Sequence, residues 1–193
     1  MMIETNRLIL RPFQKGDLED LYAYLKEPLV HCFASMQTNT LEDAKVALKH
    51  RMQNDEYCFA IVLKKNGMVI GEIDAHYETS QPDIVNGIYD TFSPCWMLNK
   101  DYLKHGYMYE AAHAFFEYLF HDKQARRIYT YTEDDNIACQ KLCEKLGMRQ
   151  EGLFKQFVTF VNDEEGHPIY ENTYQYAILK DEFISLGEYL CFI

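Results

Sequence analysis

A single glycine, Gly106, separates an apolar run that resembles a strand, residues 95–98, from an amphipathic helix that begins near residue 107. Glycine lets a backbone approach a ligand closely, because it has no side chain. The helix behind it directs N–H groups and a partial positive charge at the same loop. This arrangement predicts a pyrophosphate site built from backbone amides. The residues expected to form it are Leu103, Lys104, His105, Gly106, Tyr107, Met108 and Tyr109.

Composition restricts what this site can serve. The chain has 193 residues, 48% of them hydrophobic, and a formal net charge of −11, which suits one domain spanning residues 1–193. An acidic chain is a poor partner for a phosphate backbone, so we expect no nucleic acid. The charge is compatible with a cationic substrate such as an amine, and also with an acidic surface that only aids solubility.

The sequence shows neither a targeting segment nor a metal motif. It has no run of 18 apolar residues and no signal-peptide pattern, so we expect a cytoplasmic protein without a membrane span. Six cysteines without C-x-x-C or metal-ligand spacing predict reduced thiols and no metal. Cys139 and Cys143 are four residues apart and share one face of an expected helix, where the simplest reading is a pair of half-buried core thiols.

Alternating strands and helices must position these groups. Asn66-Gly67 between two apolar runs predicts a hairpin, and Thr40 with Asp43 predicts a capped helix start. Residues 79–91 have no clear period and predict a loop. The expected strands are 3–13, 58–63, 68–77, 92–99, 127–132, 148–161 and 168–179, and the expected helices are 17–27, 40–52, 107–121 and 136–146.

This order of elements predicts an α+β domain. A short apolar tail, residues 183–193, follows the last strand. We expect it to pack either on the domain or on a second copy of the chain, as a homodimer.

Three segments carry a family resemblance. They resemble the opening strand, the acyl-CoA loop and the following helix of the GNAT acetyltransferases, in the ribosomal-protein N-terminal acetyltransferase (RimJ/RimL-like) branch. The order and spacing agree over roughly residues 3–183. The segments are Glu4-Thr5-Asn6-Arg7-Leu8-Ile9-Leu10-Arg11-Pro12-Phe13 with Asp17, Gly106-Tyr107-x-x-Glu110-Ala111, and Asn136-x-x-Cys139-x-x-Leu142-x-Glu144-Lys145-Leu146-Gly147-Met148.

The resemblance implies a fold and a cofactor. The fold would be a mixed, mostly antiparallel sheet of about seven strands, flanked by helices and splayed between its fourth and fifth strands. The cofactor would be acetyl-CoA, with no metal. Its pantetheine arm would pair with the strand at Met97 and Leu98 and would contact Asn136 and Cys139 after the next strand. Asn136 is equally suited to capping its helix.

The loop departs from the family pattern. The family's Gln/Arg-x-x-Gly-x-Gly/Ala is here Leu103-x-x-Gly106-x-Met108. Met108 replaces a very small residue, so the diphosphate is expected to bind less tightly or in a repacked loop. Lys104 and His105 add positive charge that partly compensates, although Lys104 can also be read as a solvated loop lysine.

Acyl transfer also needs an acid for the leaving thiolate and a base for the ammonium. Many family members have a tyrosine where this chain has Cys143, and the RimJ/RimL branch often has a serine where it has Cys139. Either thiol is a candidate acid, because an unperturbed cysteine has a pKa of about 8.5.

The base is open in the same way. Ser93 takes the place of a common family glutamate. Glu72, Asp74 and His76 alternate along one strand and share a face. That face either borders the cleft, which would make one of them a base, or is a solvated outer face.

The resemblance therefore implies an N-acetyltransferase that moves the acetyl group of acetyl-CoA to a primary amine by direct attack. The acceptor would be a protein N-terminus, a polyamine or a small amine. The alternative is a catalytically degenerate member that binds acyl-CoA without turnover, because the usual tyrosine, the usual glutamate and the small residue at position 108 are all replaced.

Overall fold

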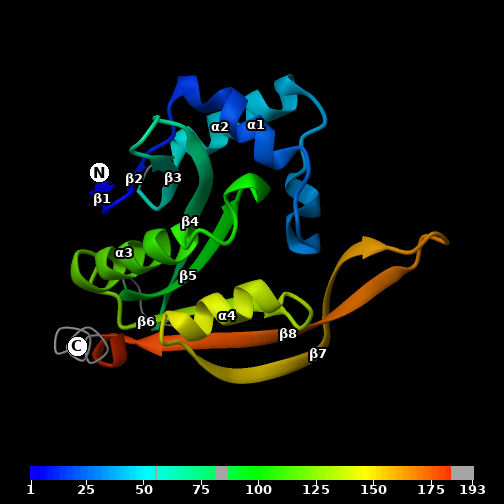
Figure 1. Ribbon diagram of the computed structural model, residues 1–193. Coiled ribbons are helices and arrows are strands. Elements are labelled where there is room, and N and C mark those ends of the chain that lie inside the picture. The colour runs from blue at the N-terminus through cyan, green and yellow to red at the C-terminus, as the bar shows by residue number, and fades with distance from the viewer. Residues whose placement is uncertain (55, 81–86, 184–193) are drawn as a thin grey trace. The chain divides into compact units, whose positions relative to one another are not determined.

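The computed structural model describes residues 1–193 except 55, 81–86 and 184–193 (Figure 1). Its strands form one eight-stranded sheet in the order β1-β2-β3-β4-β5-β6-β8-β7. The β5–β6 pair is parallel, whereas β1–β2, β2–β3, β3–β4 and β6–β8 are antiparallel. The expected α+β fold with a mixed, mostly antiparallel sheet is confirmed, with eight strands instead of about seven.

The bounds of the elements agree with most of the expected ranges. The strands are β1 Ile3–Glu4, β2 Leu8–Arg11, β3 Cys58–Leu63, β4 Val69–Thr79, β5 Tyr89–Leu98, β6 Arg127–Glu133, β7 Arg149–Asn162 and β8 Pro168–Leu179. The α-helices are α1 Leu18–Leu25, α2 Leu41–Gln53, α3 Tyr107–His121 and α4 Ile137–Lys145. Among the described residues, no helix is both long and apolar enough to cross a membrane.

The chain divides into two compact units. The first comprises Met1–Ala75, Cys95–Ala114 and Phe160–Ile169, and the second comprises His76–Pro94, Phe115–Thr159 and Tyr170–Ile193. Strands β4 and β5 therefore each contribute residues to both units.

The first unit packs α1 and α2 against strands near the N-terminus. Helix α2 begins as expected, because Thr40 accepts a hydrogen bond from the Asp43 amide while the Asp43 carboxylate accepts from the Thr40 amide. Apolar residues from both helices, from β3, β4 and β5, and from the segment before α1 form the core. These buried residues are Phe13, Leu21, Tyr24, Leu25, Leu48, Cys58, Ala60, Val62, Val69 and Met97.

The second unit is built around β6. This strand pairs antiparallel with β8 along all of its seven residues, from Arg127 with Leu179 to Glu133 with Thr173. Its parallel register with β5 covers only two residue pairs, Thr91 with Arg127 and Phe92 with Ile128. Such a short register is what the implied splay between these two strands requires.

Two expectations about the elements were wrong in detail. The strand expected over 3–13 is interrupted after Glu4, because the chain forms a turn in which the Thr5 amide donates to the Leu8 carbonyl. The loop expected over 79–91 was placed too widely at both ends, since β4 includes Thr79 and β5 starts at Tyr89; residues 81–86 of that range lie outside the described residues. Two 3-10 helices, His31–Met36 and Lys100–Tyr102, had no clear sequence signal. The tail beyond Phe183 lies outside the described residues.

Candidate active site

The loop before α3 has the backbone geometry of an anion cradle. Lys104 and Gly106 both adopt positive φ, 63° and 76°. The amide of Glu110 donates to the carbonyl of Gly106 at 3.1 Å, which begins the helical ladder. N–H groups of a helix's first turn have no acceptor within the helix and point out of its end. The loop residues 103–106 are exposed, so an anion can reach this end of α3.

Arg7 braces this loop from the N-terminal segment. Its Nη1 donates to the carbonyl of His105 at 2.9 Å, and its Nε donates to the Glu110 carboxylate at 2.6 Å. Its guanidinium also lies 4.5 Å from the centre of the Tyr107 ring. One side chain thus contacts the loop before Gly106, the first residue of α3 and a carboxylate one turn further on.

Glu110 is the partner that completes the brace. Its Oε1 accepts from the Thr5 hydroxyl at 2.6 Å and from the Arg7 amide at 2.7 Å. Burial by itself would raise the pKa of Glu110, but the hydrogen bonds from Thr5 and Arg7 lower it below the ordinary value. The carboxylate is therefore charged near neutral pH, and the electrostatic part of the brace is present there.

The backbone conformation constrains the loop at Gly106. A Cβ added there would make an ordinary contact with Arg7 Nη2 at 3.6 Å but would be strained by the positive φ. The adjoining end of β5 is held by β4, since the Asn99 amide donates to the Ile70 carbonyl at 2.8 Å. A Cβ on Gly71 would come within 2.2 Å of the Met97 carbonyl oxygen. The expected pantetheine strand, Met97 and Leu98, therefore packs tightly on a glycine of β4.

The second unit contains the expected residues at the start of α4. Asn136 Oδ1 accepts from the Cys139 amide at 3.2 Å, so Asn136 is the N-cap of this helix. Cys139 is half-buried and Cys143 is fully buried. A hydrogen bond with Cys139, together with burial, raises the pKa of the Cys143 thiol well above its ordinary value. Cys143 therefore stays protonated, and Cys139 is the more accessible thiol of the pair.

The candidate bases have different environments. Glu72 is buried and accepts bonds from Arg51 at 2.5 and 2.7 Å and from the Tyr24 hydroxyl at 2.9 Å. Asp74 follows on β4 and is half-buried in the same unit. Ser93 belongs to the second unit, where its side chain hydrogen-bonds Tyr129. Glu72 therefore forms a buried ion pair with Arg51, which gives this carboxylate a structural role.

The sequence pattern does not indicate two functional groups. Thr5, Arg7 and Glu110 lie within the family-like motifs, but these motifs predict no role for their side chains. Glu78 was missed because β4 was expected to end at residue 77. The alternation of Glu72, Asp74 and His76 continues to Glu78 and was the available signal.

Known proteins share both the sequence pattern and the fold. The model of the acetyltransferase (GNAT) domain family matches residues 7–149. An uncharacterized N-acetyltransferase, YnaD, of Bacillus subtilis is 29% identical over 183 residues, covering 95% of this chain and 99% of YnaD.

Solved structures show the same similarity. An acetyltransferase of the GNAT family from Bacillus anthracis has a TM-score of 0.79 and 27% identity, over 94% of this chain and 99% of that one. RimL, a ribosomal L7/L12 α-N-protein acetyltransferase solved with coenzyme A disulfide-bonded to one of its cysteines, has a TM-score of 0.71 at 14% identity, over 94% of this chain and 99% of RimL. The matched family model covers most of the chain, which therefore belongs to the GNAT acetyltransferases.

Proposed function

We propose that this protein transfers the acetyl group of acetyl-CoA to a primary amine by direct attack of the amine on the thioester. The braced loop before α3 is the observation that carries the proposal. Its positive-φ residues, its exposed position at the N-terminus of α3 and its support by Arg7 suit a diphosphate. The cradle would comprise Leu103, Lys104, His105, Gly106, Tyr107, Met108 and Tyr109.

Each remaining part of the cofactor has a candidate partner. The backbone of Met97 and Leu98 would pair with the pantetheine arm, in the manner of an added strand. Asn136 would contact the arm while it caps α4. Cys139 would protonate the leaving thiolate, because it is more accessible than the buried Cys143.

The acceptor would be a primary amine. Protein N-termini, polyamines and small amines all carry the required ammonium group. A protein N-terminus, and with it the RimJ/RimL-like branch, is supported by neighbours of the same fold such as RimL, which act on ribosomal proteins. Assembly as a homodimer and a cytoplasmic location are further proposals, and light scattering of the purified protein tests the first.

Calorimetric titration of the purified chain with acetyl-CoA, coenzyme A and dephospho-CoA tests the cofactor. We expect micromolar binding of acetyl-CoA, about −8 kcal/mol. Absence of binding would overturn the proposal.

An amine screen then tests transfer. Release of the coenzyme A thiol is followed with spermidine, 2-phenylethylamine and a peptide with a free N-terminal alanine. Turnover of one amine supports the transferase. Binding without turnover across the whole panel would favour the catalytically degenerate alternative. Cys139→Ala should lower kcat, whereas Cys143→Ala should mainly lower stability through a core cavity.

A further inference from the structure

Three polar side chains from three adjacent strands meet in the second unit. The Tyr129 hydroxyl, on β6, donates to Glu78 Oε1, on β4, at 2.7 Å. The Ser93 side chain, on the intervening β5, hydrogen-bonds Tyr129. Glu78 is exposed, whereas Ser93 and Tyr129 are half-buried. The sheet thus exposes the Glu78 carboxylate to solvent, and the hydroxyl of the half-buried Tyr129 orients it through a hydrogen bond.

The protonation states of the pair follow from its surroundings. Burial, followed by the bond to Glu78, raises the pKa of Tyr129 to about 12. Tyr129 therefore remains a hydrogen-bond donor throughout the neutral range. A carboxylate has two oxygens and about four acceptor positions, so the bond from Tyr129 to Oε1 leaves Glu78 capacity to accept a proton or a donor from a ligand.

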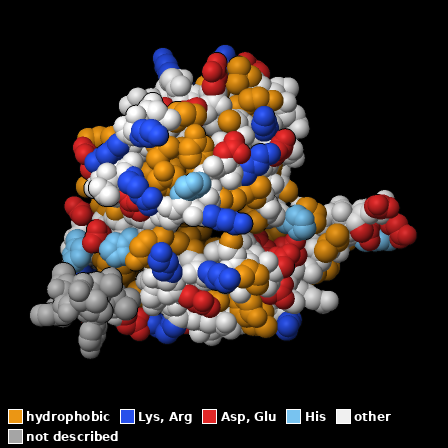
Figure 2. Space-filling view, in the orientation of Figure 1, with side chains coloured by type: hydrophobic (Ala, Val, Ile, Leu, Met, Phe, Trp, Pro, Cys, Tyr) orange, Lys and Arg blue, Asp and Glu red, His pale blue; other side chains and the backbone are white. Residues whose placement is uncertain are grey.

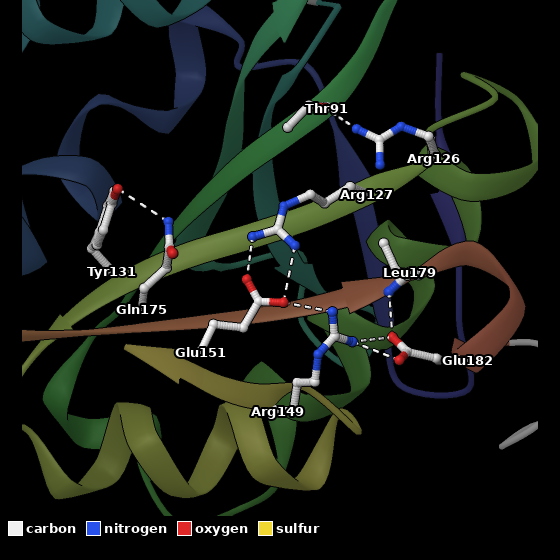
Figure 3. A network of polar contacts seen from close by, with 9 residues as sticks. All are labelled: Thr91, Arg126, Arg127, Tyr131, Arg149, Glu151, Gln175, Leu179 and Glu182. Carbon is white, nitrogen blue, oxygen red and sulfur yellow. Dashed lines mark hydrogen bonds and ion pairs between the residues drawn. The ribbon is translucent and has the colours of Figure 1, made fainter. Parts of the chain in front are cut away.

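Among the described residues, an arginine and a histidine lie near the pair. The Arg127 guanidinium lies 5.8 Å from the centre of the Tyr129 ring. It is held by Glu151 through contacts of 3.1 and 2.5 Å, and Glu151 also binds Arg149 (Figure 3). On β4, the exposed His76 precedes Glu78 by two residues on the same strand face. The nearby arginine thus already has a carboxylate partner of its own.

Aromatic rings extend from this pair across the unit. Tyr131 lies 5.6 Å from Tyr129, Phe157 lies 5.7 Å from Tyr131, and Phe154 lies 5.1 Å from Phe157, between ring centres. Tyr131, Phe154 and Phe157 are 42%, 39% and 51% exposed. Exposed rings beside a carboxylate are complementary to an organic cation, which gains from both charge and ring faces.

We propose that Glu78, oriented by Tyr129, is the general base that takes the proton from the acceptor's ammonium group, and that the rings of Tyr131, Phe154 and Phe157 bind the acceptor's apolar part. This inference rests on the proposed function and names its acceptor class, a primary amine that carries an apolar or aromatic group.

The proton and bond changes balance. The ammonium gives one proton to Glu78, which later releases it to water. The neutral amine attacks the thioester carbonyl, a C–N bond forms and the C–S bond breaks. A second proton leaves the nitrogen as the amide forms and one proton joins the coenzyme A thiolate, so the net products are the amide, the free thiol and one proton.

Glu78→Gln tests the base, with Glu164→Gln as an exposed control at the β7–β8 turn. With 2-phenylethylamine at pH 7.5, Glu78→Gln should lower kcat about 100-fold and leave the Kd of acetyl-CoA within about twofold. The loss should shrink towards pH 10, where the amine deprotonates without help. A kcat equal to that of wild type, or a loss that is constant with pH, would overturn the proposal.

Tyr129→Phe tests positioning, with Tyr170→Phe as the exposed control. With 2-phenylethylamine, kcat should fall about tenfold while KM and the Kd of acetyl-CoA stay within about twofold, because Glu78 loses the hydroxyl that orients it; a purely structural role would change KM and the Kd as well. Because His76 also lies near this pair, His76→Gln is measured alongside and should leave kcat within about twofold of wild type. A loss of kcat in His76→Gln as large as that in Glu78→Gln would overturn the assignment.

Phe157→Ala tests the aromatic part and the acceptor class. It should raise KM for 2-phenylethylamine several-fold more than KM for spermidine, and equal changes would overturn the class. Failure of the proposed function is distinguishable, because it appears in the wild-type protein, as absent acetyl-CoA binding or absent turnover of every amine, before any variant is compared. If wild type binds acetyl-CoA but acetylates none of the three amines, the base proposal falls as well.

Discussion

The starts of α3 and α4 satisfy their backbone groups in opposite ways. At α4 the chain supplies its own cap, since Asn136 Oδ1 accepts from the Cys139 amide at 3.2 Å. At α3 the corresponding place is Gly106, whose carbonyl receives the first helical bond but which has no side chain to cap the first turn. Support comes from outside, through Arg7 on the N-terminal segment.

The difference separates a helix start that is closed by its own sequence from one that is held open. The Arg7 guanidinium contacts a carbonyl, a carboxylate and a ring. It cannot accept a hydrogen bond from the amides of the first turn, because a guanidinium is only a donor. The brace can therefore fix the loop while it leaves the N–H groups for an anion. A self-capped start such as that of α4 uses one of those amides for its own stability.

A side chain at position 106 should weaken cofactor binding more than any other change at the two helix starts. Gly106→Val adds a β-branched side chain at positive φ, 3.6 Å from Arg7 Nη2. We expect acetyl-CoA binding to weaken about 100-fold, about 3 kcal/mol by calorimetry. Gly166→Val is the matched control, since Gly166 has a φ of 86° and open space around its Cβ position. Equal affinities for both variants would show that the α3 start is not the diphosphate site.

Removing the brace should have the next largest effect. Arg7→Met deletes the bonds to Glu110 and to the His105 carbonyl, so the loop loses its preorganisation. We expect the Kd of acetyl-CoA to rise about tenfold and hydrogen exchange of residues 103–109 to accelerate. Arg126→Met, which removes a surface pair with Asp90, serves as the control. Faster exchange without a change in Kd would restrict Arg7 to a structural role.

The self-capped helix start gives a smaller and different response. Asn136→Ala should lower the free energy of unfolding by about 1 kcal/mol, which is a few degrees in Tm for a chain of this size. Asn136→Asp keeps an oxygen acceptor and should retain most of that stability. If the Asp variant nevertheless binds acetyl-CoA more weakly, Asn136 both caps α4 and contacts the cofactor; unchanged binding would leave only the cap.

Protonation of Glu110 in acid should have the smallest effect, a modest loss of stability at the contact between Arg7 and Glu110. The folded pKa of Glu110 lies below its ordinary value, so the stabilisation is present above about pH 4.3 and is lost as the pH falls through the folded pKa. The free energy of unfolding of wild type should exceed that of Glu110→Gln by at most about 1 kcal/mol at pH 7. Thermal melts should show this difference disappearing below about pH 4. A gap that is constant with pH would mean that packing, and not charge, holds Glu110.

Local signals in the sequence predicted local structure well. The Thr40–Asp43 capping box, the Asn136 cap and the glycine before α3 each act within a few residues, and each was found in the structure. Strand ends were less predictable. The interruption after Glu4 comes from a short turn in which the Thr5 amide donates to the Leu8 carbonyl, and hydrophobic periodicity does not indicate it. The extension of β4 to Glu78 depends on the surrounding sheet, which local periodicity does not encode either.

The sequence by itself determined the class of fold, the family motifs and the position of the loop, because periodicity, caps and turn residues act over short stretches of chain. Only the tertiary structure decided the partners. Arg7 meets Glu110 across 103 positions, and Tyr129 meets Glu78 across 51. A charged or polar side chain has many chemically suitable partners in a sequence, and the sheet and helix packing select among them by bringing one within hydrogen-bonding distance.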